Sequence, residues 1–149
     1  MRIMGIDPAV SKPNYYAVWE DGNLKKTGFA TDPTDLSESI RACDIVYIES
    51  QFFQCNPKTL KDLAMCSGEL VATSKMMNTK FELVSPSTWQ SRAGIKYGRR
   101  PKDMSVHFWK KHKAKLLMDR AYEVSGCSDI VNDDEASAIL IAYAMGVCE

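Results

Sequence analysis

Acidic side chains stand where three apolar segments of this sequence begin or end. Asp7 ends an apolar run at the start of the chain, and Glu49 ends a run of strand-forming residues. A third group directly precedes the long apolar segment near the end of the chain and consists of Asp133, Asp134 and Glu135. Carboxylates at the ends of buried elements converge at one edge of a fold, where their hard oxygens bind divalent cations. The pattern therefore predicts a divalent-metal site.

The strands that position the first two acids follow from the hydrophobic pattern. After the strand that ends at Asp7, residues 15–19 and 24–30 are predicted to form two more strands. Gly22 lies between these two runs and indicates a hairpin, so the first three strands are predicted to form an antiparallel meander. Residues 44–50 form the next strand after a short helix. A helical crossover predicts that this strand returns parallel to the first one.

A long helix is predicted after this strand. Asn56 is a favourable N-cap and Pro57 suits the first helical position. Apolar residues then repeat at intervals of three and four as far as Met77. Gly68, in the middle of this helix, costs about 1 kcal/mol of helix propensity relative to Ala. We therefore expect Gly68 to mark a close packing contact.

The next part of the chain is predicted to hold a strand, a loop and a helix. Residues 81–84 form the strand, which Pro86 stops, and residues 94–101 form the loop. The helix is predicted over residues 102–117. Trp89, between the strand and the loop, is expected to pack in the core.

The last helix is predicted over residues 132–144. Asn132 is its N-cap, and Glu135 three residues later completes an arrangement like a capping box. Acids in a first helical turn are favourable because of the helix dipole, which is a structural reason for their presence. The apolar residues that follow imply a helix packed against the sheet. Its start is then expected to lie over the strand ends that carry Asp7 and Glu49.

The composition bounds the possible organisation. The chain has 149 residues, of which 45% are hydrophobic, and this suits one domain over residues 1–149. No apolar stretch approaches the roughly 20 residues of a membrane span. The sequence opens with a strand rather than a signal peptide, and its five cysteines lack C-x-x-C spacing. We expect a cytoplasmic protein with reduced thiols and no membrane partner.

The net charge is zero, but the basic residues are concentrated in one segment. Residues 92–120 contain ten lysines and arginines against two acids, so the rest of the chain is acidic. This asymmetry predicts a surface that faces a polyanion such as nucleic acid. A solvated lysine-rich helix is the alternative explanation for residues 110–115, whereas the glycine and proline around Arg99 and Arg100 favour a binding loop.

In their order and spacing, these segments resemble the RuvC family of Holliday-junction resolvases, members of the RNase H-like superfamily. The resemblance is carried by Gly5-Ile6-Asp7-Pro8, by Glu49 and by the acidic start of the last helix, and it extends to Ser67-Gly68-Glu69-Leu70 and Ser85-Pro86-Ser87-Thr88-Trp89. It implies an α/β RNase H-like fold. The expected sheet is mixed and five-stranded, with three antiparallel strands followed by parallel strands, and it is flanked by helices.

The resemblance also implies a metal-dependent phosphodiester hydrolysis. Two Mg²⁺ ions about 4 Å apart, for which Mn²⁺ substitutes, activate water and stabilise charge on the phosphate. The implied ligands are Asp7, Glu49 and Asp134. Ser137 stands where the family has a second acid on the last helix, and a hydroxyl is a poor ligand for a hard cation. Either Asp133 or Glu135 compensates, or the serine inactivates the protein.

Residues expected to contact DNA follow from the same resemblance and from the basic segment. Lys102 resembles a lysine beside the cleaved phosphate, where it would stabilise developing charge as a catalytic residue. Phe52 falls where the family places an aromatic near the junction centre, and one of Phe52 and Phe53 is expected to pack under its loop instead. The residues expected to contact the DNA backbone are Lys96, Arg99, Arg100, Lys110 and Lys113.

The sequence therefore predicts a crossover junction endodeoxyribonuclease that resolves four-way junctions by paired symmetric nicks. A homodimer supplies the two matched sites. The expected location is the bacterial cytoplasm or a phage-infected host cell. One alternative is a nuclease of the same superfamily with broader action on branched or flap DNA. The other is a catalytically impaired protein that binds branched DNA, which the hydroxyl of Ser137 suggests.

Overall fold

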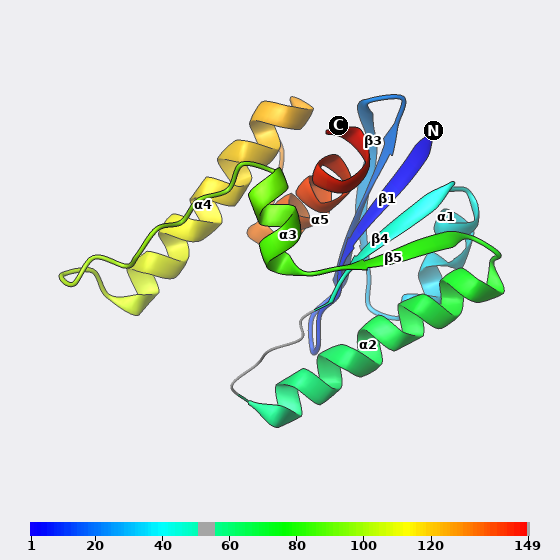
Figure 1. Ribbon diagram of the computed structural model, residues 1–149, viewed down its shortest axis with the longest axis horizontal. Helices are drawn as coiled ribbons and strands as arrows, with labels where there is room; N and C mark the ends of the chain where they lie inside the picture. The colour runs from blue at the N-terminus through cyan, green and yellow to red at the C-terminus, as the bar shows by residue number, and fades with distance from the viewer. Residues whose placement is uncertain (51–55, 149) are drawn as a thin grey trace.

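A five-stranded mixed sheet organises the computed structural model, which describes residues 1–50 and 56–148 (Figure 1). The order of the strands across the sheet is β3-β2-β1-β4-β5. The strands are β1 (Arg2–Asp7), β2 (Asn14–Glu20), β3 (Asn23–Ala30), β4 (Ile45–Glu49) and β5 (Lys80–Val84). Strand β1 therefore lies at the centre of the sheet, where it pairs with β2 on one side and β4 on the other.

The pairing of the strands confirms the predicted topology. Strands β1, β2 and β3 pair antiparallel, whereas β1 with β4 and β4 with β5 pair parallel. Asp21 and Gly22, with φ of 50° and 78°, form the turn between β2 and β3. Two successive residues with positive φ make the turn type that matches the twist of a two-residue hairpin. The hairpin predicted from Gly22 is thus confirmed.

Helices cover both faces of the sheet (Figure 1). One face carries η1 (Pro33–Leu36), α1 (Ser37–Arg41) and α2 (Pro57–Met76). The opposite face carries α3 (Pro86–Arg92), α4 (Val106–Ser125), α5 (Asp133–Ala142) and the π-helical turn η2 (Tyr143–Val147). Among the described residues, no helix has the length and apolar character needed to span a membrane.

Alternation along β1 divides the core into two layers. Met4 and Ile6 pack with the α2 side, whereas Ile3 packs with the α5 side. Gly5 also faces α5, because a Cβ atom there would lie 2.5 Å from the carbonyl oxygen of Ala138 and 2.6 Å from the backbone nitrogen of Ala142. The missing side chain lets the α5 backbone lie directly on the central strand. This close approach fixes the depth at which α5 sits.

Helix α3 was not expected from the sequence, which predicted only that Pro86 stops the preceding strand. Pro86 occupies the first turn of α3, where a proline loses no hydrogen bond. Ser85 caps the helix, with its Oγ accepting a hydrogen bond from the Thr88 backbone at 3.3 Å. The same proline that ends a strand therefore starts a helix here, and Trp89 is buried at 1% exposure.

Helix α4 lies further along the chain than predicted. It spans Val106–Ser125 rather than residues 102–117. Its start is set by Ser105, whose Oγ accepts a hydrogen bond from the Phe108 backbone at 3.2 Å. Its end is set by Gly126, which takes the left-handed conformation at φ 71°. Lys102 consequently lies in the turn before the helix and not on it.

Gly68 does not mark a close packing contact, so that prediction was wrong. It lies on the exposed side of α2, and a Cβ atom there would meet no atom of the described residues within 4 Å. The sequence pattern could not reveal this, because a glycine beside an apolar stripe can lie on either side of it.

Gly68→Ala is therefore expected to stabilise the protein by about 0.5–1 kcal/mol, since alanine removes the entropic cost of glycine in a helix without a clash. Urea denaturation of the two proteins measures this difference. A lower free energy of unfolding for Gly68→Ala would show that the outer face of α2 needs the small residue.

Candidate active site

A cleft of about 340 Å³ opens where β1 and β4 end beside the start of α5. Ile6 pairs with Ile48 across the parallel strands, so the next residues, Asp7 and Glu49, leave adjacent strands side by side. Asp134 enters the same cleft from α5. The structure thus brings together the carboxylates of three elements that are far apart in the sequence.

The remaining walls of the cleft come from three further segments. The β1–β2 connection, the start of α2 and helix α3 supply Pro8, Ala9, Val10, Lys12, Thr59, Leu63, Pro86, Trp89 and Gln90. Helix α3, which sequence reasoning missed, therefore forms one side of the site. Strand β5 ends at Val84, and α3 begins two residues later after its cap, Ser85. This short connection holds α3 beside the edge of the sheet where the cleft lies.

The surroundings of Asp7 in the cleft disfavour its ionised form. Its pKa is raised well above the ordinary value, chiefly by desolvation and then by the negative charges of Glu49 and Asp134. Asp133 adds to this effect and Lys12 opposes it. A carboxylate that is disfavoured by burial and by like charges gains the most from a nearby cation.

Lys12 lines the cleft beside Asp134, and sequence reasoning did not identify it. Its Nζ lies 3.9 Å from Oδ2 of Asp134. The pKa of Asp134 is raised by burial and by Asp133, and Lys12 lowers it. A lysine in a loop carries no periodic signal, so its only sequence clue was its closeness to Asp7.

Asn14 fixes the loop that carries Lys12. This buried side chain accepts a hydrogen bond from the backbone nitrogen of Ala9 at 2.9 Å. It also donates one to the carbonyl of Ala30 at 3.1 Å. Because Asn14 starts β2 and Ala30 ends β3, the loop is tied to the rigid sheet and not left to move independently.

The Glu49 carboxylate is held in place by a buried indole. Nε1 of Trp89 donates a hydrogen bond to Oε2 of Glu49 at 2.6 Å. Trp89 is fully packed in the core, as the sequence predicted, but its polar atom also reaches the cleft. The bond orients one carboxylate oxygen and links α3 to the end of β4.

Ser137 also lines the cleft, one helical turn after Asp134. It is buried at 8% exposure, in the cavity that Asp7, Glu49 and Asp134 also line. The prediction that both residues share one helical face is confirmed, because both reach the same cavity. The site therefore contains a neutral oxygen on α5 next to the acid of the preceding turn.

The Glu135 side chain forms hydrogen bonds on the side of α5 that faces away from the cleft. Its Oε1 accepts a hydrogen bond from Thr27 Oγ1 at 2.7 Å, and its Oε2 accepts one from the Val131 backbone at 2.8 Å. Asn132 caps the helix as predicted, with Oδ1 accepting from the Glu135 backbone at 2.9 Å. The Glu135 side chain reaches Val131 rather than the N-cap residue that a capping box requires. Neither Glu135 nor Asp133 is among the described residues that line the cleft.

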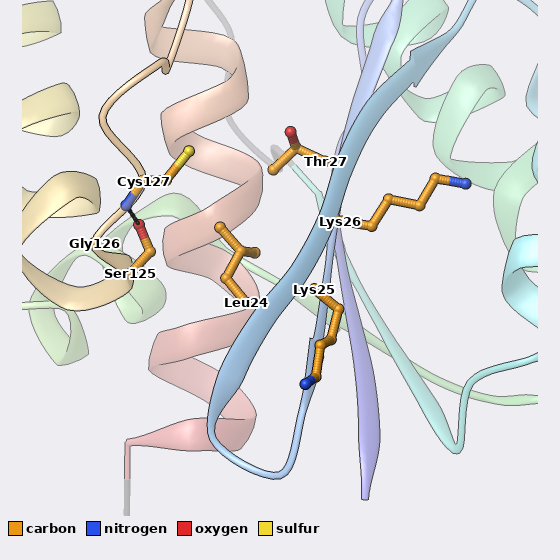
Figure 2. Close-up of a pocket in the computed structure, with 7 residues that line it drawn as sticks. All are labelled: Leu24, Lys25, Lys26, Thr27, Ser125, Gly126 and Cys127. Carbon is orange, nitrogen blue, oxygen red and sulfur yellow. Dashed lines mark hydrogen bonds between the residues drawn. The ribbon is translucent and has the colours of Figure 1, made fainter.

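A second cavity of about 270 Å³ lies on that other side, between β3 and the end of α4 (Figure 2). No carboxylate is among the described residues that line it, and Figure 2 shows Lys25 and Lys26 extending away from the α4 end while Leu24 faces it. Ser125 Oγ accepts a hydrogen bond from the backbone of Cys127 at 3.1 Å. The described residues that line this cavity therefore include no carboxylate ligand for a hard cation.

The carboxylates of the first cleft suit a hard divalent cation, although they do not form a preformed ligand cluster in the described part of the chain. Within residues 1–50 and 56–148, no three His, Cys, Asp or Glu side chains form a ready metal-ligating group. The carboxylates of Asp7, Glu49 and Asp134 nevertheless share one cavity, and their repulsion raises the pKa of Asp7. Carboxylate oxygens are hard donors of the kind that Mg²⁺ and Mn²⁺ prefer.

The basic residues predicted to contact DNA are not among the described residues that line the cleft. Lys96, Arg99, Arg100, Lys102 and Lys110 are all exposed, on the loop before α4 and on α4 itself. Lys113 is partly buried, and its Nζ lies 5.4 Å from the ring centroid of Tyr97. Burial, with smaller contributions from Asp133 and Glu49, raises the pKa of Tyr97 to about 12. Phe52 and Phe53 lie outside the described residues.

Comparison with solved structures identifies the fold. Thermus thermophilus RuvC in complex with a Holliday junction substrate is similar over 97% of this chain and 92% of its own, at 17% identity and a TM-score of 0.66. A second Thermus thermophilus RuvC structure matches over the same shares at 14% identity and a TM-score of 0.64. The yeast mitochondrial Holliday junction resolvase Ydc2 matches over 95% of this chain and 76% of its own, at 18% identity and a TM-score of 0.47. No protein-family model and no curated protein matches the sequence.

These likenesses establish a RuvC-like RNase H fold for the chain. The predicted mixed sheet, with three antiparallel strands followed by parallel ones, is confirmed. The resemblance stated from the sequence is therefore confirmed at the level of the fold.

Proposed function

We propose that the protein is a metal-dependent endonuclease that resolves four-way DNA junctions. The observation that carries this proposal is the convergence of Asp7, Glu49 and Asp134 in one cleft of a RuvC-like fold. The similar Thermus protein was solved with a Holliday junction substrate, which supports branched DNA as the substrate class.

In this proposal Asp7, Glu49 and Asp134 hold Mg²⁺, for which Mn²⁺ substitutes. The bound ions supply an activated water and stabilise charge on the phosphate. The chain's own contribution is to hold the ligands: Trp89 orients Glu49, and the packing of α5 on β1 sets the distance of Asp134 from Asp7. The Ser137 hydroxyl contributes a neutral hydrogen-bonding oxygen on the same wall.

Lys12 is placed to contact the phosphate in this cleft, because it is the one cation among the described residues that line it. Lys12→Ala is expected to slow cleavage about 10- to 100-fold, since a charge that neutralises the developing anion is lost. Single-turnover nicking rates at saturating protein measure this. Lys25→Ala, at an exposed lysine on β3 away from the cleft, is the matched control. Equal rates for both variants would exclude Lys12 from the reaction.

The basic loop and α4 are proposed to carry the arms of the junction. Lys96, Arg99 and Lys102 precede α4, and Lys110 lies on it. Contacts of this kind position the DNA backbone without reading its sequence. We propose Lys102 as a contact to the DNA backbone outside the cleft and Lys12 as the charge within it.

Two copies of the chain are proposed to act together as a homodimer. Resolution of a four-way junction requires two matched nicks, and the described part of each chain brings Asp7, Glu49 and Asp134 together in a single cleft. A two-fold symmetric dimer places two identical sites on a substrate of the same symmetry.

The test is incubation of the protein with a four-way junction that is labelled on each strand, in Mg²⁺ or Mn²⁺. Paired nicks at symmetric positions, with ligatable ends, support the proposal. Equal cleavage of flaps and of other branched substrates would favour the broader nuclease. Nicks that persist in EDTA would contradict the metal dependence.

A branched-DNA-binding protein without catalysis is the second candidate, and Ser137 favours it. A hydroxyl at this position in the cleft contributes no negative charge to a metal site. Ser137→Asp separates the two functions. If the unsubstituted protein binds junctions without nicking and Ser137→Asp nicks them, the site is complete except for this residue. Tight binding without nicks by both proteins would establish the binder.

A further inference from the structure

The start of α4 exposes apolar side chains at the end of the molecule that projects furthest from the sheet. Phe108 is 64% exposed and Val106 is 54% exposed. His107, between them, has its ring edge-on to Phe108, with centroids 5.8 Å apart. In Figure 1 the loop before α4 runs from α3 alongside the helix to the far left, where α4 begins away from the packed layers. We call residues 106–108 and the preceding loop 94–105 the α4 tip.

The α4 tip is internally braced. Ser105 receives the backbone hydrogen bond of Phe108 on its Oγ and that of Trp109 on its carbonyl, at 3.2 and 3.0 Å. Arg100 Nη1 donates to the carbonyl of Met104 at 2.8 Å, which closes the turn before the helix. Phe108 is therefore displayed on a defined backbone.

The tip is also anchored to the body of the protein. Lys113 lies over the ring of Tyr97 at 5.4 Å, which joins α4 to the loop. Arg120 Nε donates to the carbonyl of Ala93 at 2.7 Å, at the point where the loop leaves α3. Because α3 forms one wall of the acidic cleft, these contacts fix the tip relative to the cleft.

The surroundings of the exposed aromatic are strongly positive. Asp103 is the one acid of the loop 94–105. Besides Arg100, five basic residues flank Phe108 in the sequence: Lys96, Arg99 and Lys102 in the loop before α4, and Lys110 and Lys111 on α4. All five are exposed, and no ion pair engages any of them in the described part of the chain. An aromatic ring framed by unneutralised cations suits a ligand that has both phosphates and flat apolar faces.

From these observations we propose that Phe108 is a base-stacking contact for unpaired nucleotides at a DNA branch point. The inference rests on the proposed binding of branched DNA and adds a specific residue to it. Stacking of an aromatic ring on a base is possible only where the base has lost a stacked neighbour, as at a branch or in a single strand. The cations around Phe108 hold the adjoining phosphates and leave the ring to recognise the opened bases.

A second copy of the chain is the less suitable occupant of this surface. Two tips brought together would place two sets of unneutralised lysines and arginines against each other, which is unfavourable at an interface. A nucleic acid supplies the opposite charge. The charge complementarity therefore favours DNA over self-association.

The test uses a four-way junction with 2-aminopurine at the branch nucleotides, in Ca²⁺ so that the strands stay intact. Stacking on Phe108 quenches the fluorescence of this base. Phe108→Ala is expected to lose the quenching and to bind the junction about tenfold more weakly. Phe108→Trp is expected to restore both. Tyr122→Ala, at another exposed aromatic of α4, is the control and should leave both unchanged.

A second measurement separates stacking from charge. Phe108→Ala should keep the salt dependence of junction binding, whereas Lys110→Ala should reduce its slope by about one. Unchanged affinity and quenching in Phe108→Ala, with junction binding intact in the unsubstituted protein, would overturn the stacking role alone. Absence of any junction binding by the unsubstituted protein would instead overturn the proposed function. A change of oligomeric state in Phe108→Ala would assign the tip to contacts between copies.

Discussion

Asp7→Asn is expected to abolish junction cleavage, with a rate loss of at least about a thousandfold. In the proposed mechanism Asp7 is the ligand from the central strand, placed next to Glu49 by the register of β1 and β4. An amide preserves the shape of the side chain but removes the charge that holds a divalent cation. Nicking of a labelled junction by the folded variant measures the effect. Asp35→Asn, at an exposed acid of η1, is the matched control.

The same substitution is expected to stabilise the protein when divalent ions are absent. The pKa of Asp7 is raised in the folded state by burial and by neighbouring acids. The folded state therefore holds this proton more tightly than the unfolded state does, and ionising Asp7 at neutral pH costs stability. This cost develops as the pH rises above the ordinary pKa of the carboxyl group. Asn carries no such cost, so the melting temperature should rise.

With Mg²⁺ added, the unsubstituted protein should have a higher melting temperature than Asp7→Asn. The unsubstituted protein gains stability by binding the ion, whereas Asp7→Asn gains little. Thermal melting with and without Mg²⁺, at acidic and neutral pH, tests both parts. A variant that melts lower than the unsubstituted protein without metal, or that shows the same gain with Mg²⁺, would contradict this account of the cleft.

Gly5→Ala is expected to destabilise the protein by about 3 kcal/mol, because it introduces overpacking in a closed core. The new Cβ atom would lie 2.5 Å from the Ala138 carbonyl oxygen and 2.6 Å from the Ala142 nitrogen. Both contacts are with backbone atoms, which cannot rotate away. Strand β1 cannot yield either, since Gly5 pairs with Ala17 on one side and Tyr47 on the other.

The strain in Gly5→Ala must therefore lift α5 from the sheet. Asp134 and Ser137 move with α5, whereas Asp7 and Glu49 stay on the strands, so the proposed ligand set opens. Cleavage should fall further than the folded fraction does when both are measured at a temperature where most of the variant is folded. Gly68→Ala is the matched control, because its Cβ atom would lie more than 4 Å from every residue that the structure describes. An unchanged melting temperature for Gly5→Ala would show that α5 has room to adjust.

The strands and their antiparallel or parallel pairing could be predicted from the sequence and its resemblance, whereas helix α3 was missed. The hairpin turn at Asp21 and Gly22 and the apolar runs that end in acids are local signals, since each depends on residues a few positions apart. A helical crossover then leads β4 back parallel to β1. The convergence of Asp7 and Glu49 follows from that topology.

The errors arose where one local signal fits two structures. Pro86 suits the end of a strand and also the first turn of a helix, so α3 was missed. The start of α4 was placed at Lys102, directly after the loop that ends at Pro101, whereas the cap that decides the boundary is Ser105. Gly68 was assigned a packing role that only the position of α2 on the sheet could test.

The sequence by itself determined the strands, their order and the acids at their ends, because hydrophobic periodicity and turn chemistry are local. The tertiary structure decided which neighbouring side chains face the cleft. Consecutive helical residues point about 100° apart. The seating of α5 on Gly5 therefore turns Asp134 toward Asp7 and Glu135 toward Thr27. The presence of Lys12 and Trp89 in the cleft likewise depends on packing between distant segments, which no single stretch of sequence encodes.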